Sequence, residues 1–292
     1  MRIGETDAPT PDGSAVTLKA SEFRQISDLA YERFGLDLNR GKEALVASRR
    51  GKKLRERGFH SFSEYYQHVV SDPTGEALVE LIDSLTTNHT SFLREQAHFD
   101  VLARSAAGEF SGVQTLDIWS AACSSGEEPY SIGMCLANAL RAAGGRGFRI
   151  LATDISTRVL AMARRGVYPA ERFRELPDPW RRAYLLRGDG ECRGFYKIKP
   201  EIAQSVEFKR LNLIEPFPDT RAFQVIFCRN VMMYFDKPTQ QDIVQRLSRS
   251  IQVGGYLFVG HSESLTGVEH QLKYVQPAVY RKEKPSGGGS RT

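Results

Sequence analysis

The stretch "SAACSSGEEPYS", residues 120–131, predicts a short loop that joins a β-strand to an α-helix. The preceding run "TLDIW" (115–119) places Leu116 and Ile118 on one face, and apolar residues recur at helical spacing after the loop, as far as Leu140. Acidic residues directly after the loop suit the positive end of the helix dipole. A strand, a small-residue turn and a helix N-terminus together form the kind of cradle that holds nucleotide-like ligands.

The acids of this loop narrow the class of ligand. Glu127 and Glu128 stand where phosphate-binding cradles leave the helix N-terminus bare, so they would repel a phosphate. A cationic or hydroxyl-rich ligand fits the position better. An ordinary capped helix after a buried strand explains the same residues equally well, so this stretch by itself leaves both interpretations open.

The rest of the chain divides into two blocks of different pattern. Residues 17–100 show helical periodicity and no strand pattern, whereas strands and helices alternate from residue 113 onward. That alternation predicts an α/β domain with a parallel, doubly wound sheet. The segment "KYVQPAVYRKE" (273–283) is expected to add one edge strand.

Length and composition fit a protein of two globular domains. The 292 residues are 41% hydrophobic and 26% charged, and no apolar run approaches the ~20 residues of a membrane span. The four cysteines are scattered without a zinc-site or disulfide pattern, which favours a reducing cytoplasm. We expect residues 1–16 to be a disordered leader rather than a signal peptide, and residues 285–292 to be a flexible tail.

Positive charge is concentrated in one short run. Between Arg40 and Arg57 there are eight basic residues and two acids, in a chain whose net charge is +5. A helix here would present a cationic face, which is either merely solvated or a docking surface for an acidic partner. The run lacks the aromatic and glycine-rich elements of nucleic-acid-binding modules. The residues expected on this face include Arg49, Arg50, Lys52 and Lys53.

A second acid belongs to the same predicted sheet. Asp154 ends the strand in "LATDIS" (151–156), where such folds place the acid that binds ribose hydroxyls, although it would also suit the N-cap of the next helix. The phosphate-binding pattern G-x-G-x-x-G is absent. A nucleoside without phosphates therefore fits best, and S-adenosylmethionine, with its cationic sulfonium, also accounts for the nearby carboxylates.

Five motifs occur in an order and spacing that identify a family resemblance. They closely resemble those of the chemotaxis receptor glutamate methyltransferases, the CheR family, from about residue 20 to residue 283. The motifs are "LTTNHTSFLRE" (85–95), "IWSAACSSGEEPYSIGM" (118–134), "LATDIS" (151–156), "FCRNVMMYFD" (227–236) and "GGYLFVGHSESL" (254–265).

The resemblance implies a domain organisation. It predicts an all-helical N-terminal domain with a linker (17–100), followed by a Rossmann-like S-adenosylmethionine-dependent methyltransferase domain (101–284). A small antiparallel β-subdomain is expected within the latter at about 180–208. In some relatives a glycine-containing loop of this subdomain binds a C-terminal receptor peptide by strand addition. Here that loop carries Gly188, Gly190 and Gly194, which a hairpin turn explains equally well.

The resemblance also implies roles for individual residues. Asp154 matches the acid that binds the ribose, while Asn212 and Leu213 match the pair that flanks the adenine. Arg94 and Tyr234 match residues that orient the substrate carboxylate beside the methyl group. The positions that match cofactor contacts of the family are Asn88, Thr90, Arg94, Glu128, Asp154, Asn212, Leu213, Arg229 and Asn230.

These residue types agree with methyl transfer to glutamate. A glutamate side chain has a reference pKa of about 4.3 and is already a nucleophile at neutral pH, so no general base is needed, and none is evident in the motifs. Two other functions stay open: a nucleic-acid methyltransferase, against which the absence of N-P-P-[FY] argues, and an idle module that binds cofactor and receptor. Arg94 has an alternative role too, as a structural ion pair with Glu95 or Glu128.

The expected partner is a methyl-accepting chemotaxis receptor. The enzyme would form S-adenosylhomocysteine and a glutamate methyl ester in the receptor's helical region, without a metal. We expect a cytoplasmic monomer that associates with membrane-bound receptor arrays, without membrane insertion and without a nucleic-acid partner.

Overall fold

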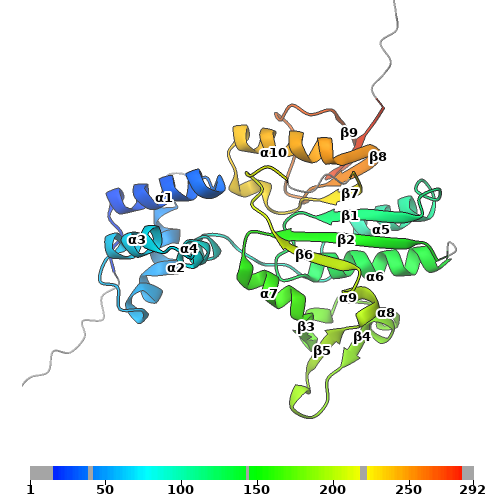
Figure 1. The fold of residues 1–292 in the computed structure, drawn as a ribbon, viewed down its shortest axis with the longest axis horizontal. Helices are drawn as coiled ribbons and strands as arrows, with labels where there is room; N and C mark the ends of the chain where they lie inside the picture. Colours follow the sequence, from blue (N-terminus) through cyan, green and yellow to red (C-terminus); the bar gives the residue numbers. More distant parts are fainter. Residues whose placement is uncertain (1–15, 39–41, 143–144, 218–221, 285–292) are drawn as a thin grey trace, which may run out of the picture. The chain divides into compact units, whose positions relative to one another are not determined.

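The computed structural model describes residues 16–38, 42–142, 145–217 and 222–284 (Figure 1). The chain divides into two compact units: the first ends at Leu85, and the second contains the chain from Thr86 onward together with the short segment Ala30–Asp37. The expected boundary at residue 100 differs, because α5 (Gln96–Ala107) packs on α6 (Glu127–Ala142) of the second unit. The expected tail and nearly all of the expected leader lie outside the described residues.

All the regular secondary structure in the described residues of the first unit is helical. Its last helix is strongly apolar on one side and packs against both preceding helices, with Leu81 and Ile82 buried. Ser61 begins the third helix by accepting a hydrogen bond from the backbone N–H of Glu64, a common N-cap arrangement. The helices are α1 (Ala20–Phe34), whose last turn belongs to the second unit, α2 (Glu43–Glu56), α3 (Phe62–Ser71) and α4 (Glu76–Leu85).

A seven-stranded sheet forms the centre of the second unit, in the order β6-β2-β1-β7-β8-β10-β9. The first five strands in this order are parallel, which confirms the doubly wound α/β prediction. β10 pairs antiparallel with both β8 and β9. The strands are β1 (Thr115–Ser120), β2 (Gly147–Asp154), β6 (Val206–Arg210), β7 (Phe223–Phe227), β8 (Ile251–Phe258), β9 (Leu272–Gln276) and β10 (Val279–Lys282).

Helices pack on both faces of this sheet, so side chains on both sides of its strands are buried. Leu116 and Ile118 of β1 belong to the core formed with α5 and α6, as their alternation predicts. Trp119 points the other way, into a second core with α10 (Lys237–Ser250). The parallel strands thus bring their carboxyl ends together at one edge, where ligands bind in folds of this type.

The small antiparallel sheet is present, but it begins earlier in the chain than the expected range of 180–208. Its order is β3-β5-β4, and the segment 206–210 pairs with β2 of the main sheet instead. The first strand has only three residues and ends in a proline, so its alternation is too short to read from sequence. The strands are β3 (Val167–Pro169), β4 (Leu185–Arg187) and β5 (Phe195–Ile198).

The C-terminal segment forms two strands where the sequence predicted one. Pro277 and Ala278 make the turn between β9 and β10, and Ala278 adopts a positive φ of 63°. Proline has no N–H to donate to a sheet, which favours a turn at this position. The chain reverses there, and β9 is the edge strand of the sheet. Among the residues that the structure describes, none of the helices has the length and apolar character needed to cross a bilayer.

Candidate cofactor and catalytic site

The loop between β1 and α6 forms a tight cradle. Gly126 has a φ of +100°, and a Cβ atom there would lie 2.8 Å from both the Cβ of Ala163 and the hydroxyl of Tyr168. Only glycine satisfies both the backbone conformation and this close approach. Gly126 is therefore required by its packing against α7 (Thr157–Arg165) and β3.

Asp154 closes the cradle from the neighbouring strand. Its Oδ2 accepts a hydrogen bond of 2.8 Å from the backbone N–H of Ser124, and its Oδ1 accepts one of 3.0 Å from that of Ser156. The N-cap of α7 is Ser156, not Asp154. The Asp154 carboxylate instead connects the end of β2 to the loop that follows β1. The Ser124 hydroxyl donates to the carbonyl of Asn88, which brings the linker motif to the same loop.

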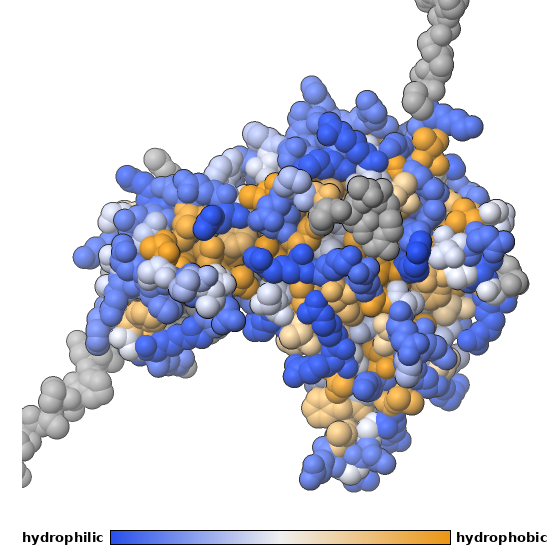
Figure 2. Space-filling view, viewed as in Figure 1, coloured by the Kyte–Doolittle hydropathy of each residue, from blue (hydrophilic) through white to orange (hydrophobic). Residues whose placement is uncertain are grey.

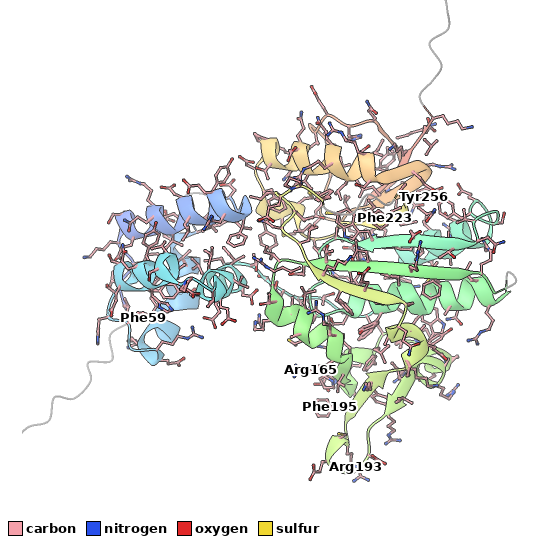
Figure 3. The ribbon with its side chains drawn as sticks, viewed as in Figure 1. Phe59, Arg165, Arg193, Phe195, Phe223 and Tyr256 are labelled. Carbon is pink, nitrogen blue, oxygen red and sulfur yellow. The ribbon has the colours of Figure 1, made fainter. Side chains whose placement is uncertain are left out.

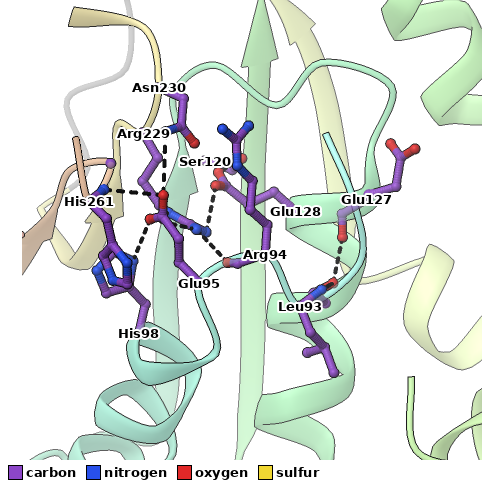
Figure 4. Close-up of polar contacts among 12 residues, drawn as sticks. Leu93, Arg94, Glu95, His98, Ser120, Glu127, Glu128, Arg229, Asn230 and His261 are labelled. Atoms are coloured by element: carbon purple, nitrogen blue, oxygen red, sulfur yellow. Dashed lines mark hydrogen bonds and ion pairs between the residues drawn. The ribbon is translucent and has the colours of Figure 1, made fainter. Parts of the chain in front are cut away.

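A buried arginine joins three segments of the site (Figure 4). The Arg229 side chain is 2% exposed, with Nη1 lying 3.1 Å from Oε2 of Glu128 and Nη2 lying 2.9 Å from Oε2 of Glu95. It also donates to the carbonyl of Arg94, and Asn230 donates to Oε1 of Glu95 at 3.4 Å. The structure thus brings Glu128, Arg229, Asn230 and the Arg94 backbone together.

The carboxylates of this cluster respond differently to the same cation. Burial raises the pKa of Glu128, against the opposing charge of Arg229 and the hydrogen bond from Ser120. Burial would also raise the pKa of Glu95, but Arg229 and the backbone N–H of His261 outweigh it and hold the pKa below its usual range. The surroundings thus favour the ionised form of Glu95, whereas a second cation beside Glu128 would stabilise its ionised form.

The two predicted catalytic residues lie on segments tied to this cluster. The ion pairs with Glu95 and Glu128 are made by Arg229, whereas Arg94 donates from Nη1 to the carbonyl of His89 at 2.9 Å. Tyr234, in the short helix η3 (Met232–Tyr234), accepts a hydrogen bond of 3.0 Å at its hydroxyl from the backbone N–H of Thr87.

The expected adenine-flanking loop follows β6 and is held from two sides. The side-chain amide of Asn212 donates to the carbonyl of Arg33 at 2.8 Å. Leu213 is buried, and its carbonyl accepts a hydrogen bond of 2.6 Å from Arg246 of α10. On the opposite side of the cradle, the carbonyl of Thr90 accepts one of 2.9 Å from Arg172.

The three glycines of the small sheet lie in the connection between β4 and β5. Gly190 and Gly194 have positive φ angles of 50° and 91°, and a Cβ on Gly188 would lie 2.2 Å from the carbonyl oxygen of Cys192. The cationic docking residues Arg49, Arg50, Lys52 and Lys53 fall on α2, but their side chains lie outside the described part of the chain.

Sequence reasoning missed several residues that build the site. Glu95 was named only as a possible ion-pair partner of Arg94, whereas the structure pairs it with Arg229. Ser124 and Arg172 carry no motif of their own, because their contacts come from segments distant in the chain. Ser124 fixes the backbone of the cradle loop, while Glu95 and Arg172 each pair with a buried charged group.

One group in the cluster has the residue types of a metal site. Glu95, His98 and His261 place one ligand atom each within 4.8 Å of one another. Arg229, however, already neutralises Glu95, and burial followed by the Arg229 charge lowers the pKa of His98 to about 3. The Arg229 guanidinium that pairs with Glu95 would also repel a dication, so this arrangement disfavours a metal ion.

Comparisons with known proteins agree with the geometry. The family described as CheR methyltransferase, SAM binding domain, matches residues 88–281, and the CheR all-alpha domain matches residues 21–86. The chain is 40% identical over 260 residues to chemotaxis protein methyltransferase 2 of Pseudomonas aeruginosa, covering 89% of this chain and 92% of that protein. It is 40% identical over 295 residues to the chemotaxis protein methyltransferase of Klebsiella aerogenes, covering 96% and 98%. The relative in Escherichia coli is 38% identical over 288 residues, covering 97% and 98%.

Fold, cradle and family match define an S-adenosylmethionine-dependent methyltransferase. The chain belongs to the CheR family of chemotaxis methyltransferases.

We expect His98 to make the second unit sensitive to acid. Its pKa is about 3 in the folded protein, against about 6.5 in an unfolded chain, so the unfolded state binds a proton that the native state does not. Stability is then complete above about pH 6.5 and falls by up to ~1.4 kcal/mol per pH unit as pH drops toward 3. Replacing His98 by Gln should flatten the decline in melting temperature between about pH 7.5 and pH 5.

The matched control is His60→Gln, which removes an exposed histidine from the first unit. It should leave the acid dependence unchanged. Parallel pH profiles for wild type and His98→Gln would contradict the assignment of the buried neutral imidazole.

Proposed function

We propose that this enzyme transfers a methyl group from S-adenosylmethionine to glutamate side chains of chemotaxis receptors. The observation that carries the proposal is the division of charge around Arg94. Arg229 engages both Glu95 and Glu128, and the His89 carbonyl uses one of the five N–H donors of Arg94. The Arg94 guanidinium keeps donors for a substrate carboxylate, and its planar fork suits that partner.

The cofactor position follows from the cradle. S-adenosylmethionine supplies an electrophilic methyl group on a cationic sulfonium, which suits the buried carboxylate of Glu128. Asp154, which ends β2 and is bonded to the Ser124 N–H of the cradle loop, would accept from the ribose hydroxyls. Asn212 and Leu213 would flank the adenine, while Asn88 and Thr90 close the site from the linker. Arg229 and Asn230 act by fixing the carboxylates.

The chemistry needs positioning more than proton transfer. The substrate carboxylate is ionised at neutral pH, and the methyl transfer requires its oxygen in line with the methyl carbon and sulfur. Alignment of this kind can lower a barrier by up to roughly 7–11 kcal/mol. The Tyr234 hydroxyl accepts the N–H of Thr87 at 3.0 Å and donates to the Thr87 carbonyl at 3.4 Å, and its proton would turn from this long bond to the substrate carboxylate. His98, buried and neutral, is not required as a base.

Two surfaces are proposed to bind the receptor. The cationic face of α2 would steer the enzyme toward glutamate-rich receptor helices. The small sheet exposes Leu186 on its edge strand β4 and Phe195 on its central strand β5, and it would bind an extended receptor peptide at an edge. Hydrophobic patches lie among hydrophilic ones on the lower lobe in Figure 2. Arg193 and Phe195 lie toward the outer end of this sheet (Figure 3). We propose a cytoplasmic enzyme that works as a monomer at receptor arrays.

A transfer assay tests this function directly. The protein is incubated with S-adenosylmethionine labelled on its methyl group and with receptor-containing membranes. We expect label in the receptor that mild base releases, as a methyl ester requires. Label in added RNA, or cofactor binding without transfer to any receptor, would contradict the proposal.

We expect Arg94→Lys to lower turnover more than cofactor affinity. Lysine keeps the charge but loses the planar fork, and a charge-assisted bond of this kind contributes ~1.5–3 kcal/mol. The kcat at saturating S-adenosylmethionine should fall roughly tenfold or more. Arg104→Lys, at an exposed position of α5, is the control. Normal turnover by Arg94→Lys would show that charge alone suffices.

We expect the basic face of α2 to speed the association of the enzyme with the receptor. Replacing Arg49, Arg50, Lys52 and Lys53 by Ala should raise the KM for receptor, leave cofactor affinity unchanged and weaken the salt dependence of the rate. The control replaces four exposed cations of the second unit, which changes the net charge equally: Lys209, Arg249, Lys273 and Lys284. If both variants share one KM and one salt dependence, α2 has no docking role.

A further inference from the structure

A second carboxylate is buried next to the proposed cofactor acid. Glu127 begins α6 with its side chain 0% exposed. Its Oε2 accepts a hydrogen bond of 2.6 Å from the Ser125 hydroxyl, and burial raises its pKa. Its Oε1 has no hydrogen-bond partner among the described residues and lies 3.4 Å from Nη1 of Arg172. Arg172 is thus the cation that balances this carboxylate.

Arg172 comes from a different part of the fold. It lies in the short helix η1 (Ala170–Phe173), which follows β3 of the small sheet. The same Nη1 that faces Glu127 also donates to the carbonyl of Thr90 at 2.9 Å. One guanidinium nitrogen therefore connects the small-sheet region, the start of α6 and the linker motif.

Packing around this nitrogen ties the same three segments together. Phe92 stacks on Phe173 with ring centroids 4.5 Å apart and meets Tyr168 edge-on at 5.3 Å. The Tyr168 hydroxyl donates to the carbonyl of Ser125, which precedes Gly126 in the cradle loop. The backbone N–H of Leu93, at a positive φ of 55°, donates to the Ser131 hydroxyl of α6.

We propose that Arg172 is a positioning residue that holds the cofactor cradle together from the small-sheet side. It neutralises Glu127 and fixes the Thr90 carbonyl, so that the linker motif and the first turn of α6 keep the spacing that the cofactor needs. This inference rests on the proposed function only in taking the cradle as the S-adenosylmethionine site. Its consequence is that anything that displaces η1, including a partner on the small sheet, changes cofactor affinity.

The surroundings of Glu127 set the expected pH behaviour. Besides Arg172, the ionisable groups that act on it are His89 of the linker motif, Tyr168 of β3 and Cys123 of the cradle loop. Without Arg172, an ionised Glu127 would be buried without a close cation. Low pH removes this unfavourable charge by protonating the carboxylate. The loss of affinity in an Arg172 variant should therefore be small at low pH and grow as pH rises.

The test measures S-adenosylmethionine binding by calorimetry, which needs no methyl acceptor and so stays independent of the receptor assignment. We expect Arg172→Met to weaken binding about tenfold or more at pH 8 and clearly less at pH 6. The double variant Arg172→Met/Glu127→Gln removes the buried charge as well, and it should recover part of the affinity and lose the pH dependence. Arg172→Lys should be intermediate, because one ammonium replaces the fork.

Arg174→Ala is the matched control, since it removes an exposed arginine two positions away on the same segment. It should bind the cofactor like wild type, and melting temperatures show whether each variant is folded. Wild-type affinity in Arg172→Met would overturn the proposal. A double variant no better than the single one, or a loss that is the same at both pH values, would also overturn it.

Discussion

The buried guanidinium of Arg229, paired with Glu95 and Glu128, is the interaction on which the site depends. It lies at the end of β7, while its partners come from the segment before α5 and from the first turn of α6. A buried cation is tolerated only with partners of good geometry, and removing one partner of such a pair costs about 3–5 kcal/mol. The Arg229 ion pairs therefore hold three separate segments in place where the cofactor is proposed to bind.

The same cluster sets the charge of the site. Two carboxylates face one buried guanidinium, so one negative charge remains in excess near the cradle. That excess suits a cationic sulfonium and disfavours a phosphate, which explains why the first loop carries acids where dinucleotide folds carry bare N–H groups. Arg94, held by its backbone to Arg229, adds a cation on the side proposed for the substrate carboxylate. Separate positions for a cation and an anion are what methyl transfer to a carboxylate requires.

Much of this arrangement follows from local sequence. The "TLDIW" strand, the small-residue loop and the acids after it predicted β1, the cradle and α6, because each depends on neighbours in the chain. Other features depend on contacts that no local pattern contains. The three-residue strand β3 exists only by pairing with β5, and the turn at Ala278 splits one apolar segment into two strands. Arg172 and Glu95 gained their roles from partners far away in the sequence.

Binding of S-adenosylmethionine to Arg229→Lys tests the central claim most directly. Lysine keeps the charge but, as a point donor, cannot hold Glu95, Glu128 and the Arg94 carbonyl together. Arg149→Lys is the control, because it makes the same substitution at an exposed arginine of β2 that pairs with Asp117. The account predicts a folded Arg229→Lys protein whose dissociation constant rises about tenfold or more, with Arg149→Lys unchanged. Wild-type affinity in Arg229→Lys would contradict it.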